Sequence, residues 1–162
     1  MMRILLSLLV LVSGGVQAQI INITALSTDG ARQLVTEGLK QCASDGYHVS
    51  VAVVDASGAL KALARSDQAG PHTVESARKK AFTAVSLGET TVELADLVAD
   101  KPNLAAALSN MHPDILILGG GIPVRYNGQL VAGIGVGGAP GGELDEACAK
   151  AAVKAVLQQA QP

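Results

Sequence analysis

Small side chains dominate this chain of 162 residues and limit how its core can be built. It has twenty-six alanines and eighteen glycines, but its only aromatic residues are Tyr47, Phe82 and Tyr126. Such a core is filled only when helices and strands approach each other closely. The same shortage argues against stacking surfaces for single-stranded nucleic acid or carbohydrate, and the formal net charge of −2 disfavours a polyanionic partner. With 49% apolar and 16% charged residues, the composition is that of one globular domain.

The N-terminus has the pattern of a signal peptide. Arg3 is the only charged residue among the first 28, and a largely apolar run follows it at 4–12. Small residues then lead to Ala18, which suits a signal peptidase. The run is shorter than the roughly twenty apolar residues of a membrane span, so we expect no permanent membrane anchor. We expect residues 1–18 to be removed and 19–162 to form a single periplasmic or secreted domain; a buried N-terminal helix is the alternative.

Export changes the interpretation of the two cysteines, Cys42 and Cys148. In an oxidising compartment such a pair is a candidate disulfide. Two buried free thiols are the alternative, because unpaired cysteine is a common core residue. The cysteines fall in the first and last predicted helices, so a bridge requires these helices to be neighbours on one face of a sheet.

Hydrophobic periodicity and turn residues predict an α+β fold with a five-stranded, mainly antiparallel sheet and helices packed on it. The expected helices span 28–45, 70–87, 91–99 and 140–159, and an alanine-rich segment at 103–108 is expected on the surface. The expected strands span 48–55, 60–66, 115–118, 122–126 and 130–136. Asn127-Gly128 between the last two strands is a strong hairpin signal. In the last helix the residues expected to point inward are Leu144, Cys148, Ala151, Ala155 and Val156.

Glycine is concentrated in two clusters, Gly119–Gly121 and Gly133–Gly142. The second cluster leads directly into a predicted helix, whose free N–H groups and dipole favour an anion such as a carboxylate or phosphate. Glu143 and Asp145 in the first turn could satisfy the same donors themselves. Alternatively, the glycines let helices pack closely on the sheet. The sequence leaves both interpretations open.

Of the three histidines, His72 is the candidate ligand residue. No metal-binding motif is present, so a closed zinc site is not expected. His48 and His112 are most simply surface or loop residues, whereas His72 follows Gly70-Pro71 in the first turn of a predicted helix. The positive end of a helix disfavours imidazolium, and neutral imidazole is the form that ligates a metal. Three polar residues follow on about the same helical face: Ser76, Lys79 and Thr83. A solvated histidine with no ligand is the alternative.

No nucleophile-elbow sequence or hydrolase triad is evident. The charged residues that could form an acid–base cluster are Asp55, Arg78, Lys80, Glu143 and Asp145. Spacing along the chain does not bring them together, and a basic run such as 78–80 is usually a solvated helix face. We therefore assign no catalytic residue.

Several segments, taken in order, resemble the motif set of the GlcG/HbpS family. They are Val51-Ala52-Val53-Val54-Asp55-Ala56-Ser57-Gly58, Ala77-Arg78-Lys79-Lys80-Ala81-Phe82-Thr83-Ala84, Gly119-Gly120-Gly121-Ile122-Pro123, Gly133-Ile134-Gly135-Val136-Gly137-Gly138 and Asp145-Glu146-Ala147. Each motif is weak alone, but their order is specific, and the resemblance covers about residues 25–158. The segment Gly70–Thr73 and the cysteine pair are similar to the exported branch of the family.

The resemblance implies a profilin-like α+β domain with an antiparallel sheet, often assembled into homo-oligomers. Members are described as haem-binding and sometimes haem-degrading, and one branch is fused to corrinoid adenosyltransferases. We therefore expect an exported protein that binds haem or a related tetrapyrrole, rather than a catalyst. One alternative is a small-molecule or haem-degrading enzyme that uses the glycine-rich loops with Arg78, Lys80 and Asp145. Another is a purely structural oligomeric module.

The expected ligand site combines the charged helix, the glycine loops and the last helix. Its residues are His72, Arg78, Lys79, Lys80, Thr83, Gly120, Gly121, Gly141, Gly142 and Asp145. His72 is expected to ligate haem iron, and Lys79 or the N–H groups near Gly141 and Gly142 to hold a propionate. Oligomerisation is expected through alanine-rich faces, either 105–107 or the second helix.

Overall fold

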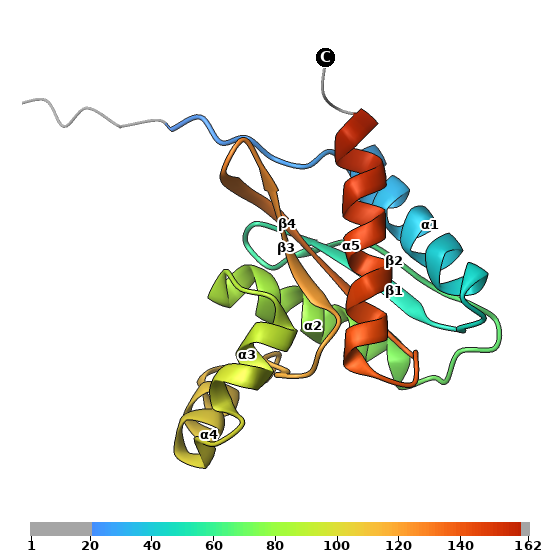
Figure 1. Ribbon diagram of the computed structural model, residues 1–162. Helices are drawn as coiled ribbons and strands as arrows, with labels where there is room; N and C mark the ends of the chain where they lie inside the picture. The colour runs from blue at the N-terminus through green and yellow to red at the C-terminus, as the bar shows by residue number, and fades with distance from the viewer. Residues whose placement is uncertain (1–20, 160–162) are drawn as a thin grey trace, which may run out of the picture.

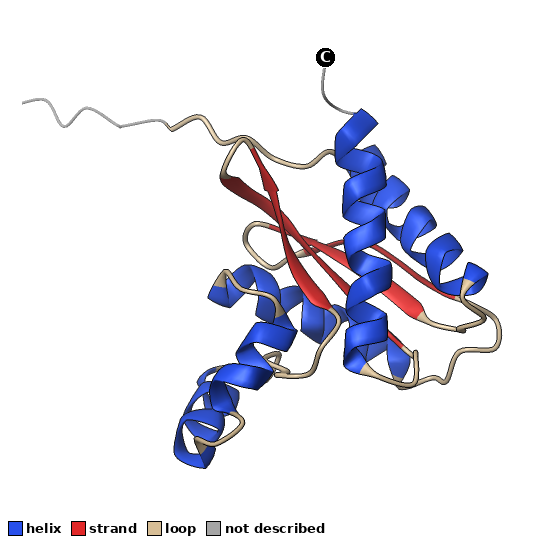
Figure 2. Ribbon diagram, in the orientation of Figure 1, coloured by secondary structure: helices blue, strands red, loops and turns tan. Residues whose placement is uncertain are grey.

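A computed structural model describes residues 21–159 as one antiparallel sheet with helices on both of its faces (Figures 1 and 2). The helices are α1 Thr28–Ser44, α2 Thr73–Leu87, α3 Thr91–Val98, α4 Pro102–Met111 and α5 Gly142–Gln159. The strands are β1 Ser50–Asp55, β2 Leu60–Arg65, β3 Gly121–Tyr126 and β4 Gln129–Gly137. The expected α+β class with an antiparallel sheet is confirmed, but the described part of the chain has four strands and not five.

The strand order is β2-β1-β4-β3, and every neighbouring pair is antiparallel. The predicted hairpin between β3 and β4 is confirmed, with Tyr126 paired to Gln129 across the turn. Asn127 and Gly128 both have positive φ, 49° and 79°, which is the conformation of the tight hairpin turn that Asn-Gly favours. The long connection from β2 through α2, α3 and α4 lets β4 pair directly with β1 in the centre of the sheet.

The main core lies between the sheet and the pair α1 and α5 (Figure 2). Strand alternation directs Val51 and Val53 of β1 toward these helices, while Val54 faces α2. All three side chains are fully buried, because helices cover both faces of the strand. A smaller apolar cluster joins Val54 to Ala81 and Val85 of α2. The sheet is therefore the middle layer of three.

Glycines on β4 let α2 lie very close to the sheet. A Cβ at Gly135 would overlap the carbonyl oxygen of Ala77, and a Cβ at Gly133 would overlap that of Ala81. These strand positions alternate with Ile134, which points to the opposite face and is fully buried there. For this part of the second glycine cluster, helix packing is the interpretation that the structure supports.

The predicted strand at 115–118 is wrong, because this segment is a loop that runs beside α2. Its Leu116 N–H donates to the Thr83 hydroxyl at 2.8 Å, so a helix side chain takes the place of a strand partner. Ile115 is buried, but Leu118 remains 49% exposed. A continuous apolar run suits a central strand, yet here it covers the side of a helix.

The helix ends agree closely with the sequence prediction, but the inward face of α5 does not. Leu144 is 38% exposed, so the expectation that it points inward is wrong. The next residue, Asp145, is 97% buried. The buried face of α5 runs through Asp145, Cys148 and Ala152. At the start of the helix this face therefore lies one residue later than predicted.

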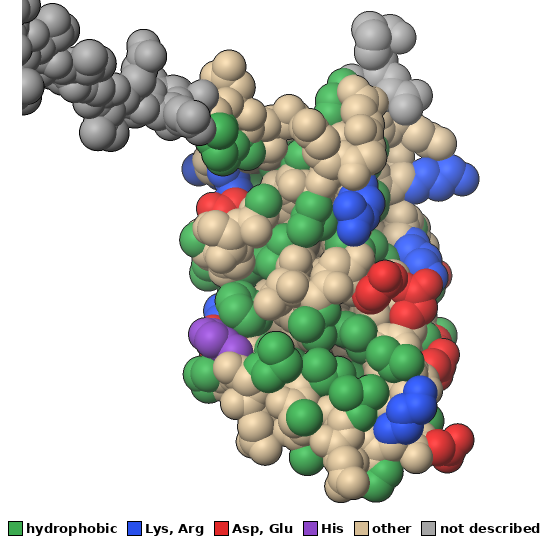
Figure 3. Space-filling view, turned by 90° about the vertical axis from the view of Figure 1, so that its left-hand side faces the viewer, with side chains coloured by type: hydrophobic (Ala, Val, Ile, Leu, Met, Phe, Trp, Pro, Cys, Tyr) green, Lys and Arg blue, Asp and Glu red, His purple; other side chains and the backbone are tan. Residues whose placement is uncertain are grey.

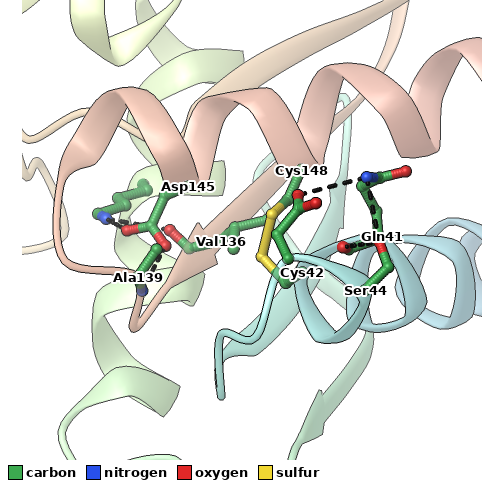
Figure 4. Close-up of a disulfide and its surroundings, with 9 residues drawn as sticks. Gln41, Cys42, Ser44, Val136, Ala139, Asp145 and Cys148 are labelled. Atoms are coloured by element: carbon green, nitrogen blue, oxygen red, sulfur yellow. Dashed lines mark hydrogen bonds and ion pairs between the residues drawn. A yellow bond between two sulfur atoms is a disulfide. The ribbon is translucent and has the colours of Figure 1, made fainter.

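The disulfide between Cys42 and Cys148 is present and joins α1 to α5 (Figure 4). The two Cα atoms are 5.4 Å apart, and both residues are fully buried. The helices are side by side on one sheet face, as the bridge requires. Gly38 lets α1 lie close to the sheet, because a Cβ there would lie 3.1 Å from the Val51 side chain of β1.

The predicted signal peptide, 1–18, lies outside the described residues. Among helices within 21–159, none has the length and apolar character needed to cross a membrane.

Candidate functional site

A cavity of about 270 Å³ lies where the starts of α2 and α5 meet the loop 138–142. Side chains from three parts of the chain line it, namely His72, Thr73, Ser76, Lys80, Leu118 and Asp145. The loop 138–142 completes the lining. Two helices therefore direct their N-terminal, positive ends toward one hollow.

Three residues on one face of α2 reach this cavity because they are spaced four apart. His72 stands at the start of the helix, Ser76 follows one turn later, and Lys80 comes one turn after that. The exposed His72 side chain makes no capping hydrogen bond to the helix. Its imidazole lies against Gly70, where a Cβ would come within 2.7 Å of the ring. A larger residue at Gly70 would push the ring from its present position.

Lys80 and Asp145 form a buried ion pair at the base of the cavity. Lys80 Nζ donates to Asp145 Oδ2 at 2.7 Å and to the Val136 carbonyl at 3.0 Å. The other carboxylate oxygen accepts the Ala139 N–H at 2.9 Å (Figure 4). The side chains are only 2% and 4% exposed. Burial raises the pKa of Asp145 above its ordinary value, while the hydrogen bonds from Lys80 and Ala139 act in the opposite direction.

This pair also fixes the shape of the glycine-rich loop. Asp145 lies in the first turn of α5 and its carboxylate reaches back to Ala139, so the loop 138–142 is tied to the helix that follows it. The Gly141 carbonyl accepts the N–H groups of Leu144 and Asp145. Gly142 and Glu143 open α5, and the first N–H groups of a helix have no acceptor within the helix itself.

A second charged cluster lies on a different face of α2. Arg78 binds both carboxylate oxygens of Asp114, at 2.6 and 2.9 Å, and also binds Glu75. The hydrogen bond from Arg78 lowers the pKa of Asp114. Lys79 donates to the Pro113 carbonyl at 2.9 Å. These contacts hold the loop that follows α4, so they are structural.

Several residues expected at the ligand site therefore lie elsewhere. Arg78 and Lys79 hold the loop at 113–114, and Thr83 donates to the Lys79 carbonyl while accepting the Leu116 N–H. Gly121 is packed against the backbone of α2, and its N–H donates to Thr91 at 2.8 Å.

The other three glycines expected at the site, Gly120, Gly141 and Gly142, have different surroundings. Gly120 is buried and does not line the cavity, and a Cβ there would lie 2.7 Å from the Asp145 Cβ and 3.1 Å from Lys80 Nζ, so the glycine leaves room for the ion pair. Gly141 and Gly142 line the cavity, as expected.

The proposed acid–base cluster is only partly assembled. Lys80 and Asp145 meet, but Arg78 is bound to Asp114. Asp55 ends β1, where its carboxylate accepts hydrogen bonds from Ser57, and Glu143 is exposed. The enzyme hypothesis that combined Arg78 with the Lys80–Asp145 pair therefore lacks its arginine.

Some residues of the cavity were missing from the expected set. Ser76 was placed on the His72 face by the sequence analysis but was not included among the expected ligand residues, although it lies one helical turn from both His72 and Lys80. Leu118 could not have been found, since its segment had the pattern of a buried strand. Thr73 is buried and hydrogen-bonded to Ser50, so it supports the start of α2.

His72 is the one residue that the sequence analysis proposed as a metal ligand. In the part of the chain that the structure describes, no three His, Cys, Asp or Glu side chains are grouped as a metal site. His48 and His112 are both exposed and neither lines the cavity. The His112 ring stacks on Phe82, and its Nδ1 accepts the Asp114 N–H.

The fold and cavity together define a class of protein: a three-layer α+β domain whose polar cavity lies at two helix starts. The chain belongs to the HbpS-like family, described as "Haem degrading protein HbpS-like", whose model matches residues 26–154. The family resemblance inferred from the ordered motifs is thus confirmed.

Solved structures show the same fold. A double mutant of HbpS from Streptomyces reticuli is 41% identical with a TM-score of 0.77, and the alignment covers 88% of this chain and 97% of that one. A structure described as a PduOC:haem complex is 31% identical with a TM-score of 0.74, covering 82% of this chain and 95% of that one.

Two curated relatives are similar at the sequence level. Protein GlcG of Escherichia coli is 32% identical over 111 residues, or 68% of this chain and 80% of that protein. The corrinoid adenosyltransferase PduO of Salmonella typhimurium is 32% identical over 114 residues. The match covers 70% of this chain but only 34% of PduO, so this chain spans about a third of that enzyme.

Proposed function

We propose that this protein is an exported binding protein for haem or a related tetrapyrrole, with His72 as the ligand to the iron. The observation that carries the proposal is the position of His72, an exposed imidazole at the edge of the cavity with no capping hydrogen bond. The description of the family and the haem complex of a 31% identical relative support the choice of ligand.

The residues that line the cavity fit a haem whose macrocycle lies across the mouth of the cavity and does not enter it completely. The hollow of about 270 Å³ is smaller than the roughly 300–1,000 Å³ of pockets that enclose a whole ligand. Leu118, 49% exposed, offers an apolar contact at its edge. When bound, haem would supply the iron and its redox chemistry, while this chain would supply the imidazole and the polar groups below it.

Replacing His72 by alanine is expected to weaken haem binding about ten-fold or more and to shift the Soret band, because the imidazole that would hold the iron is removed. Absorbance titration of the purified protein with haemin measures both effects. His48→Ala is the matched control, since His48 is also exposed but lies outside the cavity.

An unchanged affinity and spectrum in His72→Ala would show that another group ligates the iron. Absence of any Soret change in the unaltered protein would contradict the proposed function itself. Addition of a reductant and oxygen to the same samples tests the enzyme hypothesis, which expects loss of the Soret band through ring breakdown.

Export remains part of the proposal, and the buried Cys42–Cys148 disulfide is consistent with an oxidising compartment. Cleavage after Ala18 is expected in the cell that makes the protein. Intact-mass measurement of protein from the cell envelope tests it, and a mass that retains residues 1–18 would contradict cleavage.

We also propose a homo-oligomer that uses α3 and α4. Figure 3 shows hydrophobic side chains gathered on the face that carries these helices. The exposed apolar residues include Leu97, Leu104 and Met111, and no residue of α4 is buried. In contrast, the alanine face of α2 is packed on the sheet, which leaves 105–107 as the available alanine-rich segment.

Light scattering at micromolar concentration is expected to give the mass of an oligomer. Leu104→Glu should shift the mass toward the monomer, because a charge would be buried at the contact. A monomeric mass for the unaltered protein would contradict the proposed assembly.

A further inference from the structure

We infer that the cavity is a carboxylate subsite, in which Lys80, Ser76 and the start of α5 hold a carboxylate group. Two sources share this chemistry: a propionate arm of a tetrapyrrole, and a free small organic acid. The first source depends on the function proposed above, whereas the second does not.

Lys80 carries the inference, because it is buried and incompletely hydrogen-bonded. An ammonium group has three N–H donors. Asp145 and the Val136 carbonyl accept two of them, and the described part of the chain provides no acceptor for the third. The Lys80 side chain is 2% exposed and lines the cavity. A ligand oxygen in the cavity would supply the missing acceptor.

Further donors face the same space. The Ser76 hydroxyl lines the cavity and makes no hydrogen bond to another described residue. Gly142 lines the cavity at the start of α5, where the first N–H groups of a helix have no acceptor within the helix. Lys80, Ser76 and Gly142 thus bring donors from two helices to the cavity, which suits a group with two acceptor oxygens.

The charges around the cavity favour a small anion over a cation. Asp145 is already paired with Lys80 and accepts the Ala139 N–H, so its charge is compensated. Glu143 is the opposing group: it is exposed, and its carboxylate lies 3.3 Å from the Cβ position of Gly141. It should weaken the binding of an anion without preventing it. The cavity volume of about 270 Å³ suits a short carboxylate arm or a small acid.

The first experiment compares haemin with haemin dimethyl ester, whose carboxylates are blocked. We expect the ester to bind about ten-fold more weakly, the scale of one lost hydrogen bond to a charged group. Ser76→Ala should weaken haemin binding several-fold and leave ester binding unchanged. Ser86→Ala is the matched control, because Ser86 is an exposed serine of the same helix outside the cavity. Glu143→Gln should strengthen haemin binding.

Equal binding of haemin and its ester would overturn the propionate source while leaving haem binding intact. The second experiment then tests the free acid, and it also applies if haemin does not bind at all. Sodium propionate is added to the isotope-labelled protein, and amide resonances are followed by NMR. Shifts at Gly142 and Glu143 that disappear in Ser76→Ala support the subsite. If propionate also leaves these amides unmoved, the carboxylate subsite is wrong.

Discussion

Reduction of the disulfide between Cys42 and Cys148 is expected to lower the free energy of unfolding by about 4–5 kcal/mol. The bridge closes a loop of 106 positions, and a cross-link of this length strongly restricts the unfolded chain in the entropy model. Its position adds to this effect, because it joins α1 and α5 in the main core. Denaturant unfolding of the oxidised and the reduced protein measures the difference.

The variant with both Cys42→Ala and Cys148→Ala supplies the control. Its unfolding midpoint should be close to that of the reduced protein and should not respond to reductant. Thiol counting in denaturant should find no free thiol in the oxidised protein, since the described cysteines are paired. Coincident unfolding curves with and without reductant would contradict the stabilising role of the bridge.

Replacing Asp145 by alanine is expected to cost about 3–5 kcal/mol, because it leaves the buried Lys80 ammonium without its counter-charge. The Ala139 N–H also loses its acceptor, so the loop 138–142 loses a tie to α5. The free energy of unfolding from denaturant titration measures the cost. As a comparison, Lys40→Ala at the exposed Lys40–Glu37 pair should change stability by less than about 1 kcal/mol.

A double variant distinguishes the loss of pairing from the loss of packing. Lys80→Met combined with Asp145→Leu removes both charges and keeps apolar volume, so it should recover much of the stability that Asp145→Ala loses. The raised pKa of Asp145 fits this expectation, since burial of the carboxylate opposes its ionisation. If the double variant is as unstable as the sum of Lys80→Met and Asp145→Leu measured singly, the two side chains are not coupled, and the loss of pairing does not explain the cost of Asp145→Ala.

The position of this pair connects the stability of the fold with the shape of the cavity. Lys80 lies on α2, which is packed on the glycine face of β4, and Asp145 begins α5, which carries the disulfide. A substitution at Gly135 would move α2 away from β4 and shift Lys80 with it. Binding should therefore be tested only in variants whose folding has been measured.

The family membership and much of the local structure could be predicted from sequence. Ser27 caps α1, Asn127 and Gly128 make the hairpin turn, and α5 starts at Gly142 directly after the glycine cluster. Each of these features depends on groups a few positions apart, so local residue types decide them. The disulfide was a prediction from the pattern of export, and the structure confirms it.

Part of the candidate site was also predictable. Ser76 was placed on the His72 face by its spacing, and Gly141 and Gly142 at the start of the last helix, and all three line the cavity. Lys79 and Thr83, placed on the same face, do not line it. The sequence could not separate Lys80 from its neighbour Arg78, since both are basic residues of one run. Only the packing of α2 directs Lys80 into the cavity and Arg78 toward Asp114.

What the sequence by itself determined is the order of elements, their turns and caps, and the family to which the chain belongs. The tertiary structure alone decided that Lys80 meets Asp145, which is 65 positions away, and that Ile115–Leu118 lies beside α2 instead of joining the sheet. The physical reason is the range of the interactions. Caps and turns use hydrogen bonds between near neighbours in the chain, whereas the ion pair and the loop depend on which surfaces are packed together.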